Sequence, residues 1–355
     1  MISGGGTGGH IFPAIAIADA LKKQYPRSEF LFIGAKDRME MQRVPAAGYN
    51  IKGIWISGIQ RKLTADNLSF PFKLLSSLAK CRKYVRKFKP DAVIGTGGFA
   101  SGPLLFVASR MNIPCVIQEQ NSFPGITNKL LAPKAKKICV AYPNMERFFP
   151  KEKIEFTGNP IREGIKKMHQ NKTEEHTKLN LLILGGSLGA RRMNQLMDLY
   201  LNDLLNLGIN IRWQTGKLYI DELLQKHGEK QNEQLQISAF IDDMAQAYTD
   251  ADMIISRAGA GTLSELAVAA KPVLLIPSPN VAEDHQTKNA ISLVEQNAAI
   301  IYRESEPTEN FLEKVTELTQ NQPLRNALAT KLGTLALPKA DESIANQVLT
   351  LINAR

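Results

Sequence analysis

Apolar residues of this chain gather in short runs, and stretches with apolar positions three or four residues apart lie between them. Short apolar runs bounded by Gly, Pro or charged residues are typical of buried strands, and the wider spacing is typical of helices. In the first half we expect strands at 2–3, 30–33, 92–94, 115–117, 137–140 and 154–156. In the second half we expect them at 179–184, 210–214, 236–239, 253–256, 273–276 and 299–302. The alternation predicts an α/β fold with parallel sheets covered by helices on both faces.

A break in this pattern divides the chain. Gly158-Asn159-Pro160 interrupts it after the run 154–156, so we expect one domain over 1–158 and a second over 159–339. An amphipathic helix at 343–351 could dock on either domain. Only three residues precede Gly4, fewer than the about five or six of an ordinary strand, so we expect the native chain to begin earlier.

Glycine-rich turns follow four of the expected strands, at 4–9, 95–103, 185–190 and 257–265. Glycine lets backbone N–H groups approach an anion, and the helix start behind such a turn adds partial positive charge. Two such turns half a chain apart, at 4–9 and 185–190, indicate two nucleotide-binding half-molecules. The first matches G-x-G-x-x-G, but a lysine follows the strand 30–33 where a ribose-binding acid is needed, which disfavours an NAD dehydrogenase. The chain has no GxxxxGK[ST] motif.

The turn at 257–265 admits two interpretations. Glu265 could accept hydrogen bonds from sugar hydroxyls, or it could belong to a capping box that stabilises the following helix, which we favour from the residues alone. Polar clusters at 118–125, 158–162 and 283–290 also follow expected strands, where α/β proteins place ligand sites.

Composition narrows the class of protein. With 44% hydrophobic and 22% charged residues the chain is an ordinary globular protein, and we expect Cys81, Cys115 and Cys139 to be buried thiols in a reducing cytoplasm. Residues 1–160 contain 24 Lys and Arg against 10 Asp and Glu, whereas the remainder contains 20 against 24. This asymmetry indicates that the first domain meets an anionic surface.

The segment 70–90 carries much of that charge. Basic residues surround apolar positions at near-helical spacing, which predicts a helix that lies on an anionic membrane, each basic residue contributing about 1 kcal/mol. The alternative is a half-buried scaffold helix with a solvated basic face. Nucleic acid is disfavoured because no aromatic platform accompanies the charge. The candidate membrane residues are Phe72, Lys73, Leu75, Leu78, Lys80, Arg82, Lys83 and Arg86.

Nine motifs occur together and in order: GGTGGHIFPA (5–14), DRME (37–40), GTGGFASGP (95–103), EQN (119–121), GNPIR (158–162), GGSLGAR (185–191), FIDDM (240–244), RAGAGTLSE (257–265) and HQ (285–286). This set closely resembles the MurG-type N-acetylglucosaminyltransferases of bacterial peptidoglycan synthesis. The resemblance runs from about Gly4 to the C-terminus. It implies the GT-B architecture of two Rossmann-like domains and an interdomain cleft, with a C-terminal helix at about 340–355 that packs back on the first domain.

The resemblance also implies an activity. Such enzymes transfer GlcNAc from UDP-GlcNAc to the 4-hydroxyl of MurNAc in undecaprenyl-linked lipid I, which gives lipid II and UDP, with inversion and without a cofactor or metal. The basic domain would meet the cytoplasmic face of the bacterial cell membrane as a peripheral protein. The partners implied are UDP-GlcNAc, lipid I and an anionic membrane surface, with other cell-wall synthesis proteins left open and no nucleic acid.

Carried over motif by motif, the resemblance implies where each ligand binds. Uracil would meet the backbone of Ile241, the ribose Glu265, and the UDP phosphates Ser187 and the helix start. The UDP-GlcNAc-binding residues implied are Thr7, Gly8, Gly9, Asn121, Arg162, Ser187, Ile241, Ala260, Gly261, Thr262, Leu263, Ser264, Glu265 and Gln286. The candidate residues for the acceptor pyrophosphate, chosen because their loops carry free N–H groups, are Gly5, Gly6, Gly97 and Gly98.

His10 and Glu119 are the two candidates for the catalytic base that takes the proton of the acceptor hydroxyl. We favour His10, because a helix N-terminus lowers the pKa of an imidazole and keeps it neutral. Family members often carry Tyr where this chain has Phe99, and some carry Gln where it has His285. The competing functions are a UDP-GlcNAc 2-epimerase, which shares architecture and donor, and a non-catalytic membrane-surface nucleotide-sugar sensor.

Overall fold

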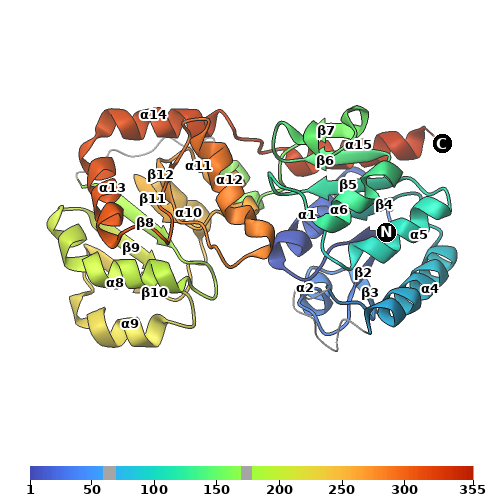
Figure 1. Cartoon of the computed structure of the whole chain (residues 1–355), viewed down its shortest axis with the longest axis horizontal. Coiled ribbons are helices and arrows are strands. Elements are labelled where there is room, and N and C mark those ends of the chain that lie inside the picture. The colour runs from blue at the N-terminus through green and yellow to red at the C-terminus, as the bar shows by residue number, and fades with distance from the viewer. Residues whose placement is uncertain (59–68, 169–177, 355) are drawn as a thin grey trace. The chain divides into compact units, whose positions relative to one another are not determined.

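A computed structural model describes residues 1–58, 69–168 and 178–354. The chain divides into two compact units: unit 1 comprises Met1–Ile161 and Lys339–Arg355, and unit 2 comprises Arg162–Pro338. Each unit is an α/β body built on one parallel sheet (Figure 1). The expected α/β class is therefore confirmed, and the division lies three residues beyond the expected position.

Unit 1 contains seven strands within the residues described. They are β1 (Ile2–Ser3), β2 (Leu31–Ala35), β3 (Asn50–Ile54), β4 (Val93–Gly95), β5 (Cys115–Glu119), β6 (Lys137–Val140) and β7 (Ile154–Phe156). The main helices are α1 (Gly8–Gln24), α2 (Glu40–Ala46), α4 (Phe70–Phe88), α5 (Ser101–Arg110), α6 (Ile126–Leu131) and α15 (Ala340–Asn353). Short 3-10 turns lie at Ala132–Lys134, Met145–Arg147 and Lys151–Lys153.

The strand order of unit 1 is β3-β2-β1-β4-β5-β6-β7, with every pair parallel. The order reverses at β1, so the chain enters the sheet at its centre and builds outward in both directions. Loops after β1 and β4 therefore meet at the carboxyl edge, beside the switch point where doubly wound folds bind ligands. These are the glycine turns at 4–9 and 95–103.

The C-terminal helix belongs to the core of unit 1. Ile344, Ala345 and Val348 of α15 are buried in one cluster with Ile17 and Leu21 of α1. At the rim of this contact, Gln24 donates a 3.1 Å hydrogen bond to Asn346. Unit 1 therefore needs the last helix of the chain, red in Figure 1, to complete its hydrophobic core.

Unit 2 repeats the plan. Its strands, within the residues described, are β8 (Asn180–Leu184), β9 (Asn210–Gln214), β10 (Leu235–Ser238), β11 (Met253–Ser256), β12 (Val273–Leu275) and β13 (Ile300–Ile301). Its helices are α7 (Glu163–Met168), α8 (Arg191–Asn206), α9 (Ile220–His227), α10 (Met244–Asp250), α11 (Ala260–Ala269), α12 (His285–Val294), α13 (Thr308–Gln320) and α14 (Gln322–Gly333), with 3-10 turns at Gly228–Lys230 and Ala282–Asp284. The parallel order β10-β9-β8-β11-β12-β13 reverses at β8. The glycine turns at 185–190 and 257–265 again follow the two central strands.

The expected strands match the observed ones to within two residues at either end, with one omission. β3 (Asn50–Ile54) was not expected, because its sequence NIKGI places a lysine and a glycine between two isoleucines. The three cysteines are buried thiols, as expected, and burial raises the pKa of each to about 12. None of the described helices combines the length and apolar character needed to span a bilayer.

Candidate active site

The first glycine turn of unit 1 presents His10. Thr7 is the N-cap of α1, with Gly8 and Gly9 forming the first turn of the helix. His10 is half-buried, and its Nδ1 lies 3.0 Å from the carbonyl oxygen of Gly5 and 3.3 Å from Thr7 Oγ1. A carbonyl oxygen only accepts hydrogen bonds, so the neutral ring carries its proton on Nδ1 and its lone pair on Nε2. The turn therefore orients a basic nitrogen.

The turn after β4 packs directly on this arrangement. Thr96 donates a 2.7 Å hydrogen bond to the carbonyl oxygen of His10. Gly98 has φ +79°, and a β-carbon there would lie 2.2 Å from the Gly5 oxygen, so only glycine fits. Phe99 packs against Gly6, and its ring faces the guanidinium of Arg38. The two turns thus form one packed assembly.

One expectation about these turns is wrong. The N–H of Gly6 is not open to a ligand, because it donates a 3.1 Å hydrogen bond to the carboxylate of Glu40. Gly5 and Gly97 are buried, whereas Gly6 and Gly98 are half-buried. The carboxylate that satisfies Gly6 lies in the DRME motif, far along the chain, and glycine content alone does not reveal it.

Glu119, the other candidate base, lies at the end of β5 and is 2% exposed. Its carboxylate accepts hydrogen bonds from the backbone N–H groups of Asn121 (3.0 Å) and Gly125 (3.2 Å) and from the side chain of Asn128 (2.8 Å). Asn121 Nδ2 adds another at 3.3 Å. Burial raises the pKa of Glu119, and these hydrogen bonds oppose the rise. Its contacts are those of a residue that organises the loop after β5.

In unit 2 the turn after β8 is pressed against the loop after β9. Gly216 has φ +81°, and a β-carbon on it would lie 2.0 Å from the backbone nitrogen of Gly189. The backbone N–H of Lys217 donates a 3.2 Å hydrogen bond to the carbonyl of Ser187. Ser187 and its neighbour Leu188 are exposed, so the turn presents its tip to solvent.

Helix α11 begins immediately after β11. Gly259 is its N-cap and makes no side-chain capping bond, so the capping-box interpretation of Glu265 is wrong. The hydroxyl of Ser264 donates to the carbonyl of Ala260 at 3.1 Å. The N-cap therefore supplies no side-chain oxygen to the first turn, which is formed by Ala260, Gly261, Thr262 and Leu263.

Glu265 instead pairs with Arg162. Arg162 donates from Nε (2.7 Å) and Nη2 (2.6 Å) to the two carboxylate oxygens, a bidentate contact between residues 103 positions apart. Tyr248, 1% exposed, places its hydroxyl 3.5 Å from the same carboxylate. Hydrogen bonding to Glu265 raises the pKa of Arg162. We did not predict Tyr248 from sequence, because its apolar surroundings are typical of a core tyrosine.

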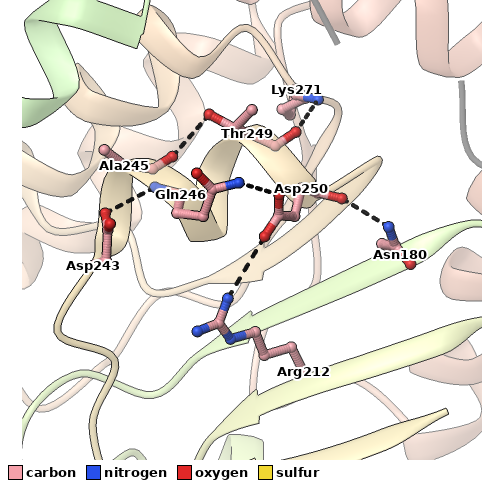
Figure 2. A network of polar contacts seen from close by, with 8 residues as sticks. All are labelled: Asn180, Arg212, Asp243, Ala245, Gln246, Thr249, Asp250 and Lys271. Carbon is pink, nitrogen blue, oxygen red and sulfur yellow. Dashed lines mark hydrogen bonds and ion pairs between the residues drawn. The ribbon is translucent and has the colours of Figure 1, made fainter. Parts of the chain in front are cut away.

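Ile241 precedes α10 and is 3% exposed. Asp243 caps this helix by accepting from the N–H of Gln246 at 2.9 Å. At the other end of α10, Asn180 donates to the Asp250 carbonyl at 2.9 Å and Lys271 to the Thr249 carbonyl at 3.2 Å (Figure 2). The same network holds the Asp250 side chain, which accepts from Gln246 at 2.6 Å and lies 3.9 Å from Arg212. These contacts fix the position of the segment that carries Ile241.

Two further expected residues, Gln286 and Asn121, bond to segments that follow strands. Gln286, in the first turn of α12, accepts a 2.9 Å hydrogen bond from the N–H of Ser278, which follows β12. Asn121 follows β5 in unit 1 and bonds Glu119. Each unit thus gathers its own expected residues at the carboxyl edge of its sheet. Among the described residues, no three His, Cys, Asp or Glu side chains gather to hold a metal ion.

Helix α4 presents an exposed apolar pair within a basic surface. Phe72 is 69% and Leu75 65% exposed, and Arg82, Lys83 and Arg86 are also exposed. Lys73, Leu78 and Lys80 are half-buried, so the helix is partly embedded in unit 1. Lys73 also lies over the ring of Trp55, which is 47% exposed and which we did not predict from sequence.

Two domain models of one glycosyltransferase family match this chain, one in each half. The Glycosyltransferase family 28 N-terminal domain matches residues 1–140, and the Glycosyltransferase family 28 C-terminal domain matches residues 180–346. A UDP-N-acetylglucosamine–N-acetylmuramyl-(pentapeptide) pyrophosphoryl-undecaprenol N-acetylglucosamine transferase of Flavobacterium psychrophilum is 51% identical, with 100% of this chain and 98% of that protein covered. The enzyme of the same name from Cytophaga hutchinsonii is also 51% identical, over 99% of this chain and 96% of its own.

Solved structures extend the comparison. The crystal structure of Acinetobacter baumannii MurG has a TM-score of 0.84 and 33% identity, with 99% of each chain covered. A UDP-N-acetylglucosamine 2-epimerase has a TM-score of 0.64 at 13% identity over 100% of this chain and 96% of its own, a likeness of fold alone. With matches of this identity along its whole length, the chain belongs to the MurG family of glycosyltransferases.

Proposed function

We propose that this protein transfers GlcNAc from UDP-GlcNAc to the 4-hydroxyl of the MurNAc residue of lipid I, giving lipid II and UDP in peptidoglycan synthesis. The observation that carries the proposal is the 51% identity, over the full length of the chain, to transferases named for this reaction. The epimerase alternative has in its favour only a shared fold at 13% identity.

In the proposed reaction, His10 is the base. The acceptor oxygen attacks the anomeric carbon of GlcNAc from the face opposite UDP. As the new carbon–oxygen bond forms, the bond to the β-phosphate oxygen breaks and its electron pair leaves with UDP. The hydroxyl proton passes to Nε2 of His10, where the Nδ1 contact with Gly5 leaves the lone pair. Glu119 then serves to hold the loop that carries Asn121.

The donor binds unit 2 in this proposal. The ribose hydroxyls bond Glu265, uracil meets the backbone at Ile241, and the diphosphate approaches Ser187 and the start of α11. Since Arg162 already occupies both oxygens of Glu265, the ribose shares or displaces that contact. A guanidinium released in this way can stabilise the negative charge that develops on UDP. Asn121, Gln286 and the turn of Thr7, Gly8 and Gly9 contribute contacts to GlcNAc.

The acceptor binds unit 1. We propose that its pyrophosphate lies along the glycine turns after β1 and β4, near Gly5, Gly97 and Gly98, while the Gly6 N–H stays bonded to Glu40. The exposed Phe72 and Leu75 of α4 enter the interface of an anionic membrane, and the neighbouring Lys and Arg residues contact its headgroups. The protein is then a peripheral protein on the cytoplasmic face of the bacterial membrane, where lipid I is available.

Transfer of radiolabelled GlcNAc from UDP-GlcNAc to a short-chain lipid I analogue, with EDTA present, tests the proposal. The expected product is the labelled disaccharide lipid. Free ManNAc would identify an epimerase, and release of UDP without transfer would identify a hydrolase. Tight binding of UDP-GlcNAc without any product would support a sensor.

A further inference from the structure

Glu40 is a buried carboxylate that the reaction described above does not use. Its side chain is 0% exposed at the start of α2. One oxygen accepts from the N–H of Gly6 at 3.1 Å, and the other accepts from the N–H of Ala35, at the end of β2, at 3.0 Å. Two backbone donors on different segments therefore hold both oxygens at fixed positions.

The chain makes room for this carboxylate with two glycines. A β-carbon on Gly5 would lie 2.2 Å from Glu40 Oε1, and one on Gly34 would lie 2.5 Å from Glu40 Cγ. Either contact is far shorter than van der Waals distance, so neither position accepts a side chain while Glu40 keeps this conformation. The absence of side chains at Gly5 and Gly34 leaves the space that the Glu40 side chain occupies.

A single peptide group connects Glu40 with His10. The N–H of Gly6, which donates to Glu40, and the C=O of Gly5, which accepts from His10 Nδ1 at 3.0 Å, belong to the same amide. A negative charge at the N–H end of an amide polarises it and increases the negative charge on its oxygen, because hydrogen bonds in series strengthen one another. A more negative Gly5 oxygen stabilises the imidazolium that forms when Nε2 accepts a proton.

We propose that Glu40 is a positioning residue for the general base: through the Gly5–Gly6 peptide it orients His10 and increases its basicity. The arrangement is equivalent to a carboxylate–histidine pair with one amide inserted between the two groups. The inference rests on the proposed role of His10 as base, and the experiments below separate the failure of the two ideas.

Other charged groups near His10 come from neighbouring elements. Glu119, at the end of β5, bonds Asn128, whose amide lies near Gly97. Arg38, before α2, stacks on Phe99 beside Gly6. Hydrogen bonds lead from Glu40 through the Gly5–Gly6 peptide to the His10 ring, so we expect removal of Glu40 to change the titration of His10 more than removal of Glu119 does.

The test is Glu40→Gln, which keeps the volume, removes the charge and replaces one of the two acceptor oxygens with an NH2 group. We expect kcat to fall roughly tenfold, a part of the about 10²–10⁴-fold that proton transfer to a positioned base supplies, with KM for UDP-GlcNAc unchanged. The acid limb of the kcat profile and the NMR titration of the His10 ring should both move to lower pH. Glu155→Gln is the control, because it removes a carboxylate that pairs with Lys137 near the far edge of the same sheet.

A lower kcat in Glu40→Gln with an unchanged pH midpoint of the His10 titration would show that Glu40 has only a structural role, and this would overturn the proposal. An unchanged kcat would overturn it as well. If Glu40→Gln does not fold, an NMR pH titration of the wild-type protein replaces it. The chemical shift of the Gly6 amide proton should then change with the same midpoint as that of the His10 ring. Different midpoints would overturn the proposal. If His10→Ala retains full turnover, His10 is not the base, whereas the ring titration still reports whether Glu40 sets its basicity.

Discussion

Arg162 and Glu265 form the most direct polar contact of the candidate donor site. Both carboxylate oxygens receive a guanidinium hydrogen bond, and Glu265 is 8% exposed. A nucleotide that binds this carboxylate through its ribose must therefore compete with a charged group of the protein itself. Affinity for the donor depends on how the three groups share their hydrogen bonds.

Replacement of Glu265 by Ala tests the ribose contact. Loss of hydrogen bonds to a charged group removes about 1.5–3 kcal/mol, so we expect UDP to bind roughly tenfold to a hundredfold more weakly. Titration calorimetry with UDP measures the change, and Tyr248→Phe serves as a milder comparison because its hydroxyl lies 3.5 Å from Glu265. An unchanged dissociation constant in Glu265→Ala would remove the ribose role.

Glu119 makes the stability of unit 1 depend on pH. Burial raises its pKa in the folded protein, so the folded state binds this proton more tightly than the unfolded state does. Stability from this group is complete below its unfolded pKa and is lost as pH rises through the folded pKa. The difference in unfolding free energy between wild type and Glu119→Gln should therefore fall from pH 4 toward neutrality, as measured by urea denaturation. A constant difference would contradict the raised pKa.

At the scale of elements, helix α15 links the end of the chain to its beginning. Ile344 is fully buried in the cluster that also contains Ile17 of α1. Since α15 supplies part of the core, unit 1 is not a continuous segment of sequence. The four glycine turns, in turn, owe their placement to the two central strands of each sheet.

Shortening Ile344 to Ala should destabilise unit 1 by about 2–5 kcal/mol, the usual cost of a cavity at a buried isoleucine. Chemical denaturation measures it. Leu199→Ala, at a side chain 59% exposed on α8, is the control and should change little. Equal effects of the two substitutions would show that α15 is not part of the core.

Elements were predictable where the pattern is strong. Buried strands such as β6 (Lys137–Val140) and β11 (Met253–Ser256) appear at their expected bounds, because parallel strands covered on both faces are apolar throughout. The contacts that define the site were not predictable. Arg162 meets Glu265 across 103 positions, and Glu40 meets Gly6 across 34, so only the folded sheet reveals that these side chains converge.

At the scale of the whole molecule, the excess of Lys and Arg in the first half of the sequence lies in unit 1. The basic half is unit 1, where α4 presents Phe72 and Leu75 among Lys and Arg residues. Unit 2 carries the candidate nucleotide contacts. The division of labour proposed here assigns the lipid-linked acceptor to the first unit and the water-soluble donor to the second.

The double substitution Phe72→Ser and Leu75→Ser tests the membrane surface. Burial of each side chain contributes about 1.5–3 kcal/mol, so we expect at least tenfold weaker binding to vesicles that contain anionic lipid. Co-sedimentation at two salt concentrations measures it, with Leu199→Ser in unit 2 as the control. Wild-type binding by the double variant would exclude α4 as the contact surface.

We propose that unit 2 binds the donor and that His10 of unit 1 supplies the base. Measurement of GlcNAc transfer and of UDP-GlcNAc affinity on the same preparation of His10→Ala tests both roles at once. We expect turnover to fall by about a hundredfold or more, the contribution of a positioned base, with donor affinity close to that of wild type. Turnover near the wild-type rate, with the fold intact, would show that His10 is not the base.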